Sequence, residues 1–212
     1  MILLATAYLP PVQYFFQFIQ HPTVVMEGCE HYQKGAYRSR CCIATANGVT
    51  YLTIPLIGGK HAQTAIREVK IDNQQGWQRQ HWRTIQAAYG SAPFFDYYAE
   101  QLYPFYHQSF KFLYDYNMAI TRWCLQTIGL PDSFQETTEY QKMFDTNTID
   151  FRQIISPKFL IATQDAYFYP TPYAQVFEYR HGFLPNLSII DVLMCQGVHT
   201  LDYLKSCQNK AM

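Results

Sequence analysis

The opening segment, residues 2–20 (ILLATAYLPPVQYFFQFIQ), constrains the fold more than any other part of the chain. Its first residues, Ile2–Ala5, carry no charge, which is typical of a strand that is covered on both faces. Pro10 keeps Leu9 out of the right-handed helical region, and Pro11 is compatible with a first helical turn. Apolar side chains then recur at the spacing of a helix (Val12, Phe15, Phe16 and Ile19). The segment therefore predicts a strand, a tight turn and a helix, and open α/β sheets bind ligands at such turns through exposed helix amides.

The rest of the chain predicts an α/β fold whose second half is mostly helical. A β-branched run at residues 23–26 completes a βαβ unit with the first strand and helix. Asn47-Gly48, between two β-rich runs, is a strong signal for a β-hairpin. The alternating pattern of residues 66–71 (IREVKI) predicts a further strand. The helices expected after it are residues 77–89, residues 93–108 with a bend or end at Pro104, residues 109–128, and a last helix that Asn186 or Ser188 caps and Gly197 ends.

The length of 212 residues suits a single domain with a substantial core. Residues 131–150 are acidic and poor in aliphatic side chains. Such a composition does not support a packed core, so we interpret these residues as a mobile loop or linker within the domain.

The balance of charge argues against nucleic acid as a partner. The chain has 16 Lys and Arg residues and 16 Asp and Glu residues, whereas duplex nucleic acid or an acidic membrane surface calls for a basic excess. No apolar run approaches the roughly 18 residues of a membrane-spanning helix, and the N-terminus has no signal-peptide pattern. The six cysteines include no Cys-x-x-Cys pair, so we expect reduced thiols and a cytoplasmic location.

Aromatic residues are unusually frequent, at 17% of the chain, with 18 Tyr, 15 Phe and 3 Trp. So many phenols cannot all be buried without hydroxyl partners, and part of them should line a surface or cleft. Such surfaces suit sugars, flat rings or protein partners, including a second copy of the chain as a homodimer.

A basic loop is the first candidate site. Lys34, Arg38 and Arg40 place three cations within seven residues, next to two predicted strands. Arginine binds a phosphate or carboxylate through a bidentate fork, and lysine acts as a point charge. The alternative is a solvated loop, which the pattern alone favours because surface loops commonly carry such charges.

Two titratable residues on predicted helices are the candidates for catalysis. His81 shares an apolar stripe with Trp77, where a histidine is more often a core residue than a base, and no His or Cys lies at metal-ligand spacing from it. We therefore expect no metal site. Asp191 lies beside an apolar stripe and needs a partner or a raised pKa, and a structural salt bridge to Arg152 or Arg180 is the stronger alternative for it. Phosphate-binding glycine loops, dinucleotide fingerprints and Gly-x-Ser-x-Gly are absent.

Four segments together resemble the WbqC-like protein family, in the form found among Bacteroides-type bacteria. They are AYLPPVQYF, YQKGAYRSRC, WQRQHWRTIQAAYGSAPFFDYYAE and HGFLPNLSIIDVLMCQG, in this order. The resemblance covers almost the whole chain and is weakest at residues 131–149. Family members tend to lie in gene clusters for surface polysaccharide or O-antigen synthesis, and a glycine-transferase role has been suggested for one. The resemblance therefore implies a cytoplasmic transferase that modifies a sugar precursor.

The opening of the chain departs from the family pattern. Many members begin with His-Gln-Pro-Asn-Tyr-Leu-Pro, whereas residues 6–11 read TAYLPP here, without the histidine. This opening also resembles, more distantly, nucleotidyl-transferring and adenylate-forming α/β folds, in which histidines at the helix start bind phosphates. The sequence leaves the cofactor open: activation of an amino acid by ATP before transfer to an amino sugar would fit such a scaffold, with the phosphate held by Lys34, Arg38 and Arg40 in place of the histidines.

We expect these candidates to converge on one cleft that binds a sugar or nucleotide-sugar. The predicted substrate-binding residues are Tyr8, Lys34, Arg38, Arg40, Trp77 and Tyr89. The cations would hold a phosphate and the aromatic rings would stack on a sugar or base. His81 is the predicted general base, with Asp191 in reserve to orient it. The alternative is a non-catalytic sugar-binding or assembly protein of the same pathway, whose Tyr-rich surface docks a glycosyltransferase or a glycan.

Overall fold

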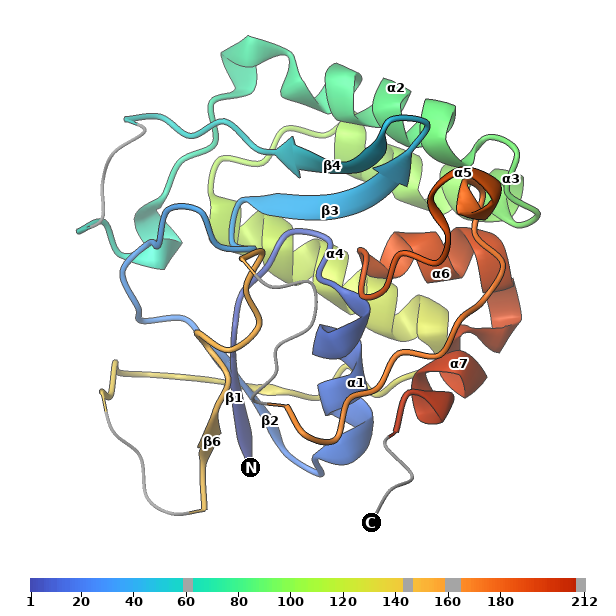
Figure 1. The fold of residues 1–212 in the computed structure, drawn as a ribbon. Coiled ribbons are helices and arrows are strands. Elements are labelled where there is room, and N and C mark those ends of the chain that lie inside the picture. Colours follow the sequence, from blue (N-terminus) through green and yellow to red (C-terminus); the bar gives the residue numbers. More distant parts are fainter. Residues whose placement is uncertain (59–62, 143–146, 159–164, 209–212) are drawn as a thin grey trace.

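The opening of the chain folds as a strand, a helix and a parallel strand, as its sequence predicts (Figure 1). β1 (Ile2–Ala5) and β2 (Val24–Glu27) are buried along their whole length, and α1 (Val12–Gln20) connects them. Leu9 has a φ of 40°, so the backbone turns outside the right-handed helical region directly before Pro10. The computed structural model describes residues 1–58, 63–142, 147–158 and 165–208.

A parallel sheet with the strand order β5-β2-β1-β6 underlies the fold. Its outer strands, β5 (Gln135–Glu136) and β6 (Ile149–Asp150), come from the segment that the sequence indicates as a mobile loop or linker. At these positions the segment is strand and is paired with β2 and β1, while residues 143–146 lie outside the described residues. Because the strands are parallel, their carboxyl ends meet at one edge, where Glu27, Glu136 and Asp150 lie. We call this the carboxyl edge.

The β-hairpin predicted around Asn47-Gly48 is confirmed. β3 (Arg40–Thr45) pairs antiparallel with β4 (Gly48–Thr53). Gly48 has a φ of 97°, which only glycine adopts without steric cost. Figure 1 shows the hairpin beyond the carboxyl end of β1, so it covers that end of the sheet.

The strand predicted for residues 66–71 is wrong. Ile66–Glu68 form the 3₁₀ turn η1, and only isolated bridges involve Lys70 and Ile71. Val69 donates its backbone N–H to the carbonyl of Ile66, so the two buried side chains lie three residues apart on one face of a tight turn. The buried residues Ile66, Val69 and Ile71 are spaced by three and then by two positions. In so short a segment this pattern resembles the alternation of a strand.

Helices form the second half of the chain, as predicted. They are α2 (Trp77–Tyr89), α3 (Phe95–Leu102), α4 (Leu113–Ile128), α5 (Glu178–His181), α6 (Ile189–Gln196) and α7 (Thr200–Ser206), with 3₁₀ turns η2 (Asn73–Gln75), η3 (Tyr103–Tyr106) and η4 (Gly197–His199). Pro104 lies in η3, where α3 has ended, and Gly197 ends α6. The sequence did not indicate α7, which follows Gly197 after a single turn and packs against α1.

One continuous cluster of buried residues extends from Ile2 to Cys207 and joins the sheet, the hairpin and the helices. Among the described helices, none combines the length and the apolar composition that crossing a bilayer requires.

Candidate functional site

The helix start after β1 is already occupied by the protein's own polar groups. The backbone N–H of Val12 donates to the carbonyl of Leu187 at 3.0 Å, and the N–H of Gln13 donates to Oδ1 of Asn186 at 2.8 Å. These amides are the ones that a phosphate would bind in a typical α/β sheet. The expectation of an open ligand-binding turn is therefore wrong for these two N–H groups, because a segment far along the chain satisfies them.

Tyr8, Trp77 and His81 do gather in space, but in a closed aromatic cluster. The Tyr8 hydroxyl is 3.0 Å from Nδ1 of His81 and 2.7 Å from the hydroxyl of Tyr106. The rings of Tyr8 and His81 stack at 5.7 Å, with Trp77 edge-on at 6.5 Å from Tyr8. Tyr8 is fully buried, and His81 is 4% exposed. Sequence reasoning did not identify Tyr106, whose place in the cluster depends on the turn after α3.

Burial sets the protonation state of His81. It lowers the pKa of the ring to about 4, although a hydrogen bond to the backbone carbonyl of Thr53 acts in the opposite direction. His81 is therefore neutral at pH 7 and able to accept a proton in principle. In this conformation the ring has almost no exposed surface for a substrate to contact.

Tyr89 and Asp191 form a second buried cluster. The Tyr89 hydroxyl donates to one carboxylate oxygen of Asp191 at 3.0 Å, and the Tyr173 hydroxyl donates to the other at 2.6 Å. Gln175 adds a third donor at 3.2 Å, and burial raises the pKa of Asp191 despite these hydrogen bonds. The predicted alternative of a salt bridge to Arg152 or Arg180 is wrong. The proline-rich segment instead supplies neutral donors, which the sequence pattern did not indicate.

The basic loop folds back to the end of β1, but its three cations separate. The backbone N–H of Tyr8 donates to the carbonyl of Tyr37 at 2.9 Å. Arg38, directly after Tyr37, is 2% exposed and makes a bidentate ion pair with Glu30 at 2.9 and 2.7 Å. Arg40 is half-buried at the start of β3, and Lys34 is exposed. The expectation that all the candidates share one cleft is therefore not met.

A second buried arginine joins the strands at the carboxyl edge. Arg152, just after β6, contacts Glu27 of β2 at 2.8 Å and Asp150 at 2.7 Å. It accepts a hydrogen bond from Arg38 on its backbone carbonyl at 3.1 Å. Burial alone would raise the pKa of Asp150, but the Arg152 guanidinium holds it below its usual range. Burial raises the pKa of Glu30 even beside Arg38.

A small cavity lies between these two arginines and the end of β1. Its lining includes Thr6, Tyr37, Arg38 and Arg152, and its volume of about 10 Å³ is room for about one water molecule. Oγ1 of Thr6 is buried without a hydrogen-bond partner in the described part of the chain. Nη1 of Arg38 likewise has no partner among the described residues, since its ion pair uses Nε and Nη2. Unpaired polar groups beside a cavity are the clearest sign of a binding site at this edge.

The profile of the WbqC-like protein family matches residues 6–169, more than three quarters of the chain. The chain belongs to the WbqC-like protein family. The match begins at Thr6 and includes Arg38, His81 and Arg152, so all the described residues that line the cavity except Ala5 lie inside the matched region. Asp191 lies outside it.

This chain is also similar to a protein from Mycobacterium tuberculosis (strain ATCC 25618 / H37Rv), "Uncharacterized protein Rv1507c", with 25% identity over 202 residues. The alignment covers 84% of this chain and 85% of the relative. No solved structure matches the chain.

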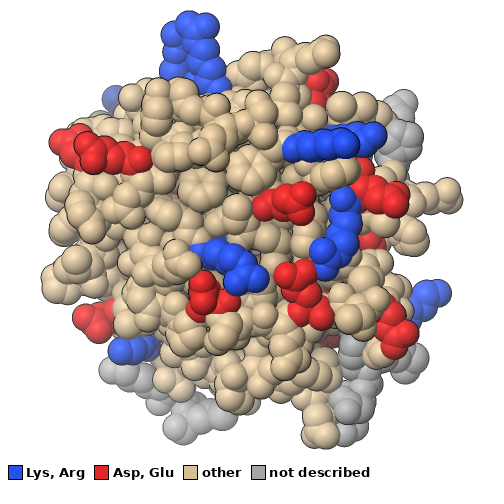
Figure 2. Space-filling model, turned by 180° about the vertical axis from the view of Figure 1, so that it is seen from behind, with Lys and Arg blue, Asp and Glu red and all other residues tan. Residues whose placement is uncertain are grey.

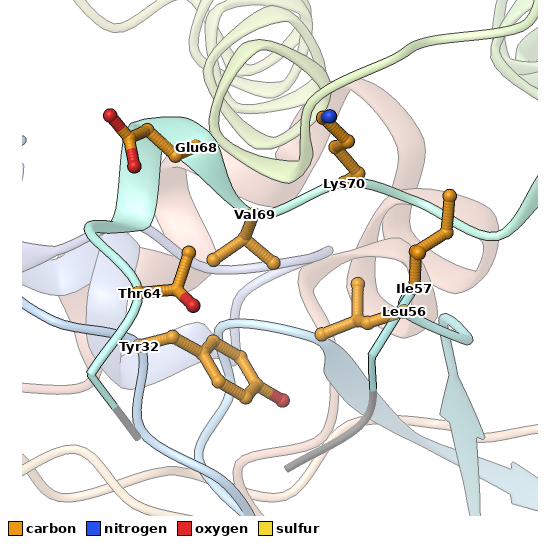
Figure 3. Close-up of a pocket in the computed structure, with 7 residues that line it drawn as sticks. All are labelled: Tyr32, Leu56, Ile57, Thr64, Glu68, Val69 and Lys70. Atoms are coloured by element: carbon orange, nitrogen blue, oxygen red, sulfur yellow. The ribbon is translucent and has the colours of Figure 1, made fainter. Parts of the chain in front are cut away.

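A larger hollow of this WbqC-like chain lies away from the predicted residues. Figure 3 shows Tyr32, Leu56 and Val69 around a pocket of about 160 Å³, with the charged ends of Glu68 and Lys70 directed away from its centre. The Tyr32 hydroxyl is bonded to Ser39 at 2.8 Å. This lining offers apolar contact but no acid–base pair, so it is a weaker candidate for chemistry than the carboxyl edge.

The electrostatics of the surface agree with the neutral composition. On the face in Figure 2, Lys and Arg lie among Asp and Glu, without a broad region of one sign. Among the described residues, no group of three or more His, Cys, Asp or Glu side chains is arranged to hold a metal ion.

Proposed function

We propose that this WbqC-like protein is a cytoplasmic transferase that acts on a sugar or nucleotide-sugar precursor of bacterial surface polysaccharide (O-antigen). It binds an anionic group of that precursor, a phosphate or a carboxylate, at the carboxyl edge. The observation that carries the proposal is the cavity at the end of β1, which Oγ1 of Thr6 borders without a hydrogen-bond partner in the described part of the chain. The Nε and Nη2 atoms of Arg38 make its hydrogen bonds to described residues, and Nη1 makes none of them. Family membership supports the sugar precursor as the substrate class.

The chemistry of the lining suits an anion. The guanidinium of Arg38 is already oriented by Glu30, so it adds donors to a ligand without losing rotamer freedom. A threonine hydroxyl adds one further donor. The cavity holds about one water molecule, so a larger anion enters only when the turn at residues 152–155 moves away from Thr6.

The transferred group is glycyl: ATP activates the glycine carboxyl group as an acyl adenylate and releases pyrophosphate, and a sugar hydroxyl or amine then accepts the glycyl group and releases AMP. The choice of glycine depends on the family resemblance, and the choice of ATP depends on the more distant likeness to adenylate-forming folds. Catalytic roles for His81 and Asp191 stay predictions. Both side chains are almost fully buried, and neither lines the cavity between the arginines.

Thermal unfolding of the full chain tests the binding step. The ligands are UDP-N-acetylglucosamine, ATP, glycine and inorganic phosphate, each measured separately. A ligand at about one hundred times its dissociation constant adds about 2.7 kcal/mol to the free energy of unfolding. We expect Arg38→Lys to reduce this effect, because lysine keeps the charge and loses the bidentate geometry. Mass spectrometry of the sugar after incubation with ATP and glycine tests the transfer.

A matched pair of variants separates binding from folding. Thr6→Val removes the unpaired hydroxyl, so it should stabilise the free protein by about 1 kcal/mol and weaken the ligand effect. Thr121→Val removes another buried, unpaired hydroxyl, on α4 and outside the cavity lining, so it should stabilise the protein and keep the ligand effect. The proposal fails if no ligand of the panel shifts the unfolding transition, or if Thr6→Val responds like the wild type.

The alternative function, a non-catalytic sugar-binding or assembly protein, is supported by the tyrosines on the surface. Tyr97, Tyr169 and Tyr179 are 65%, 64% and 78% exposed. Exposed phenols are common where proteins bind partners or glycans. Ligand binding without any transfer product would favour this alternative.

A further inference from the structure

A third hollow, separate from the carboxyl edge and from the pocket of Figure 3, lies between α3, α4 and η4. Its volume is about 410 Å³, within the range of about 300–1,000 Å³ that is typical of small-molecule sites. The side chains that line it include Tyr97 and Gln101 of α3, Trp123, Gln126 and Thr127 of α4, and Val198 of η4. We call it the α3–α4 groove.

The lining combines aromatic surface with neutral hydrogen-bonding groups. Tyr97 is 65% exposed, and its ring lies edge-on against the neighbouring Tyr98 at 4.9 Å. Trp123 packs against Phe105 at 6.0 Å, and its indole N–H is buried without a partner in the described part of the chain, so its ring and not its N–H faces a ligand. The side-chain amide nitrogen of Gln126 donates to Asp132 at 2.8 Å. Its amide oxygen can still accept a hydrogen bond from a ligand. None of the described side chains that line the groove is charged.

The end of α4 adds acceptors to the same groove. The carbonyls of Thr127 and Ile128 receive no hydrogen bond from the described residues, because the helix ends at Gly129 and Pro131 has no N–H to donate. Carbonyl and amide oxygens at the border of an aromatic surface suit a ligand with many hydroxyl groups.

We propose that the α3–α4 groove binds a neutral carbohydrate. The faces of a sugar ring carry C–H groups that pack on tyrosine and tryptophan, and its hydroxyls pair with amides and carbonyls at the rim. The described residues of the lining include no Lys or Arg, which disfavours phosphorylated sugars and nucleotides because these ligands require cations. The groove is therefore a glycan site separate from the anion site at the carboxyl edge, and it does not depend on the proposed transferase activity.

Titration of the full chain with N-acetylglucosamine, rhamnose and lactose tests this inference, by calorimetry and by tryptophan fluorescence. We expect saturable binding of at least one sugar in about the millimolar range. Tyr97→Ala should weaken it about tenfold, and Trp123→Phe should remove most of the fluorescence response. Tyr167→Ala, which changes a 54% exposed tyrosine outside the groove, should bind like the wild type.

The folding of each variant is checked by its thermal unfolding, which a side chain as exposed as Tyr97 should scarcely change. The inference is overturned if none of the sugars saturates, or if Tyr97→Ala binds them as tightly as the wild type. It is also overturned if the wild type forms a dimer that Tyr97→Ala abolishes, since the groove would then be an interface between two copies. Thr6→Val should leave sugar binding in the α3–α4 groove unchanged. The groove and the anion site at the carboxyl edge can therefore be tested separately.

Discussion

At the scale of the residue, His81 shows how burial decides what an ionisable side chain does. Its ring is enclosed by Tyr8 and Trp77, and its Nδ1 contacts the Tyr8 hydroxyl. The apolar stripe of the helix predicts that the ring faces inward, and the structure confirms this. The stripe did not indicate that the pKa falls to about 4, because Tyr8 and Thr53, which lie against the ring, come from other parts of the chain.

The depressed pKa of His81 predicts a loss of stability in mild acid. Between pH 7 and pH 5 the unfolded chain protonates this histidine, with a pKa near 6.5, whereas the folded chain does not. The unfolded state therefore binds more protons, and the free energy of unfolding falls as the pH falls, by about 2 kcal/mol for this group. We expect His81→Phe to be less stable at pH 7 but to lose about 2 kcal/mol less than the wild type on going to pH 5.

Urea denaturation at the two pH values measures this difference. Equal pH dependence of the wild type and His81→Phe would show that the ring is accessible to protons in the folded state.

At the scale of the element, α1 depends on a cap from a distant segment. Pro11 precedes the helix and offers no side-chain acceptor, so Oδ1 of Asn186 accepts the N–H of Gln13. Asn186 itself has a φ of 54°, in the left-handed region that asparagine tolerates better than most residues. The residue therefore contributes both a hydrogen bond and a favourable backbone conformation.

Two substitutions at Asn186 separate these contributions. Asn186→Gly keeps the positive φ and loses the cap, so it should cost about 1 kcal/mol. Asn186→Ala loses the cap and also places a Cβ at positive φ, so it should cost about 1–2 kcal/mol more than the glycine variant. Thermal or urea unfolding of both variants measures this order. If the two variants are equally stable, a Cβ at this positive φ causes no strain. If Asn186→Gly is as stable as the wild type, the hydrogen bond to Gln13 does not stabilise the protein.

Local signals were sufficient for the elements that carry their own periodicity or turn chemistry. Gly48 marked the hairpin, and the stripe of α4 with its final Gly129 marked the longest helix. The two-residue strands β5 and β6 are too short to show a period, and only their pairing with β2 and β1 defines them. Local sequence patterns therefore indicate a loop at residues 131–150, although this segment supplies the two outer strands of the sheet.

At the scale of the whole molecule, a buried ion pair joins two strands of the sheet that lie far apart along the chain. The three cations of the basic loop are neighbours in sequence, yet Arg38 finds its partner in Glu30, and Arg152 finds Glu27 on β2 from beyond β6. Arg38 and Glu30 are only eight residues apart, in the segment between β2 and β3. The contact of Arg152 with Glu27 depends on the parallel order of the strands, which local spacing does not reveal. The candidate site at the carboxyl edge could be anticipated only in part, through Arg38, while Thr6 and Arg152 emerge from the fold.

The two ion pairs at this edge predict that replacing Arg152 and replacing Arg67 lower the free energy of unfolding by different amounts. The side chains of Arg152 and Glu27 are 4% and 0% exposed, so Arg152→Met leaves a buried carboxylate uncompensated and should cost about 3–5 kcal/mol of unfolding free energy. Arg67 also bonds a strand-end carboxylate, Glu136, at 2.6 Å, but its side chain is 46% exposed. Arg67→Met should therefore cost about 1 kcal/mol or less.

Urea denaturation at low and at about 1 M NaCl distinguishes the two arginines, because salt shortens the Debye length to about 3 Å and screens exposed pairs most. The cost of Arg67→Met should shrink in salt, while that of Arg152→Met should persist. The double variant Glu27→Gln/Arg152→Met should be more stable than Arg152→Met alone, since it removes the unpaired buried charge. If Arg152→Met costs no more than Arg67→Met, water reaches the carboxyl edge freely and the pair is not the closed contact that joins β2 to β6.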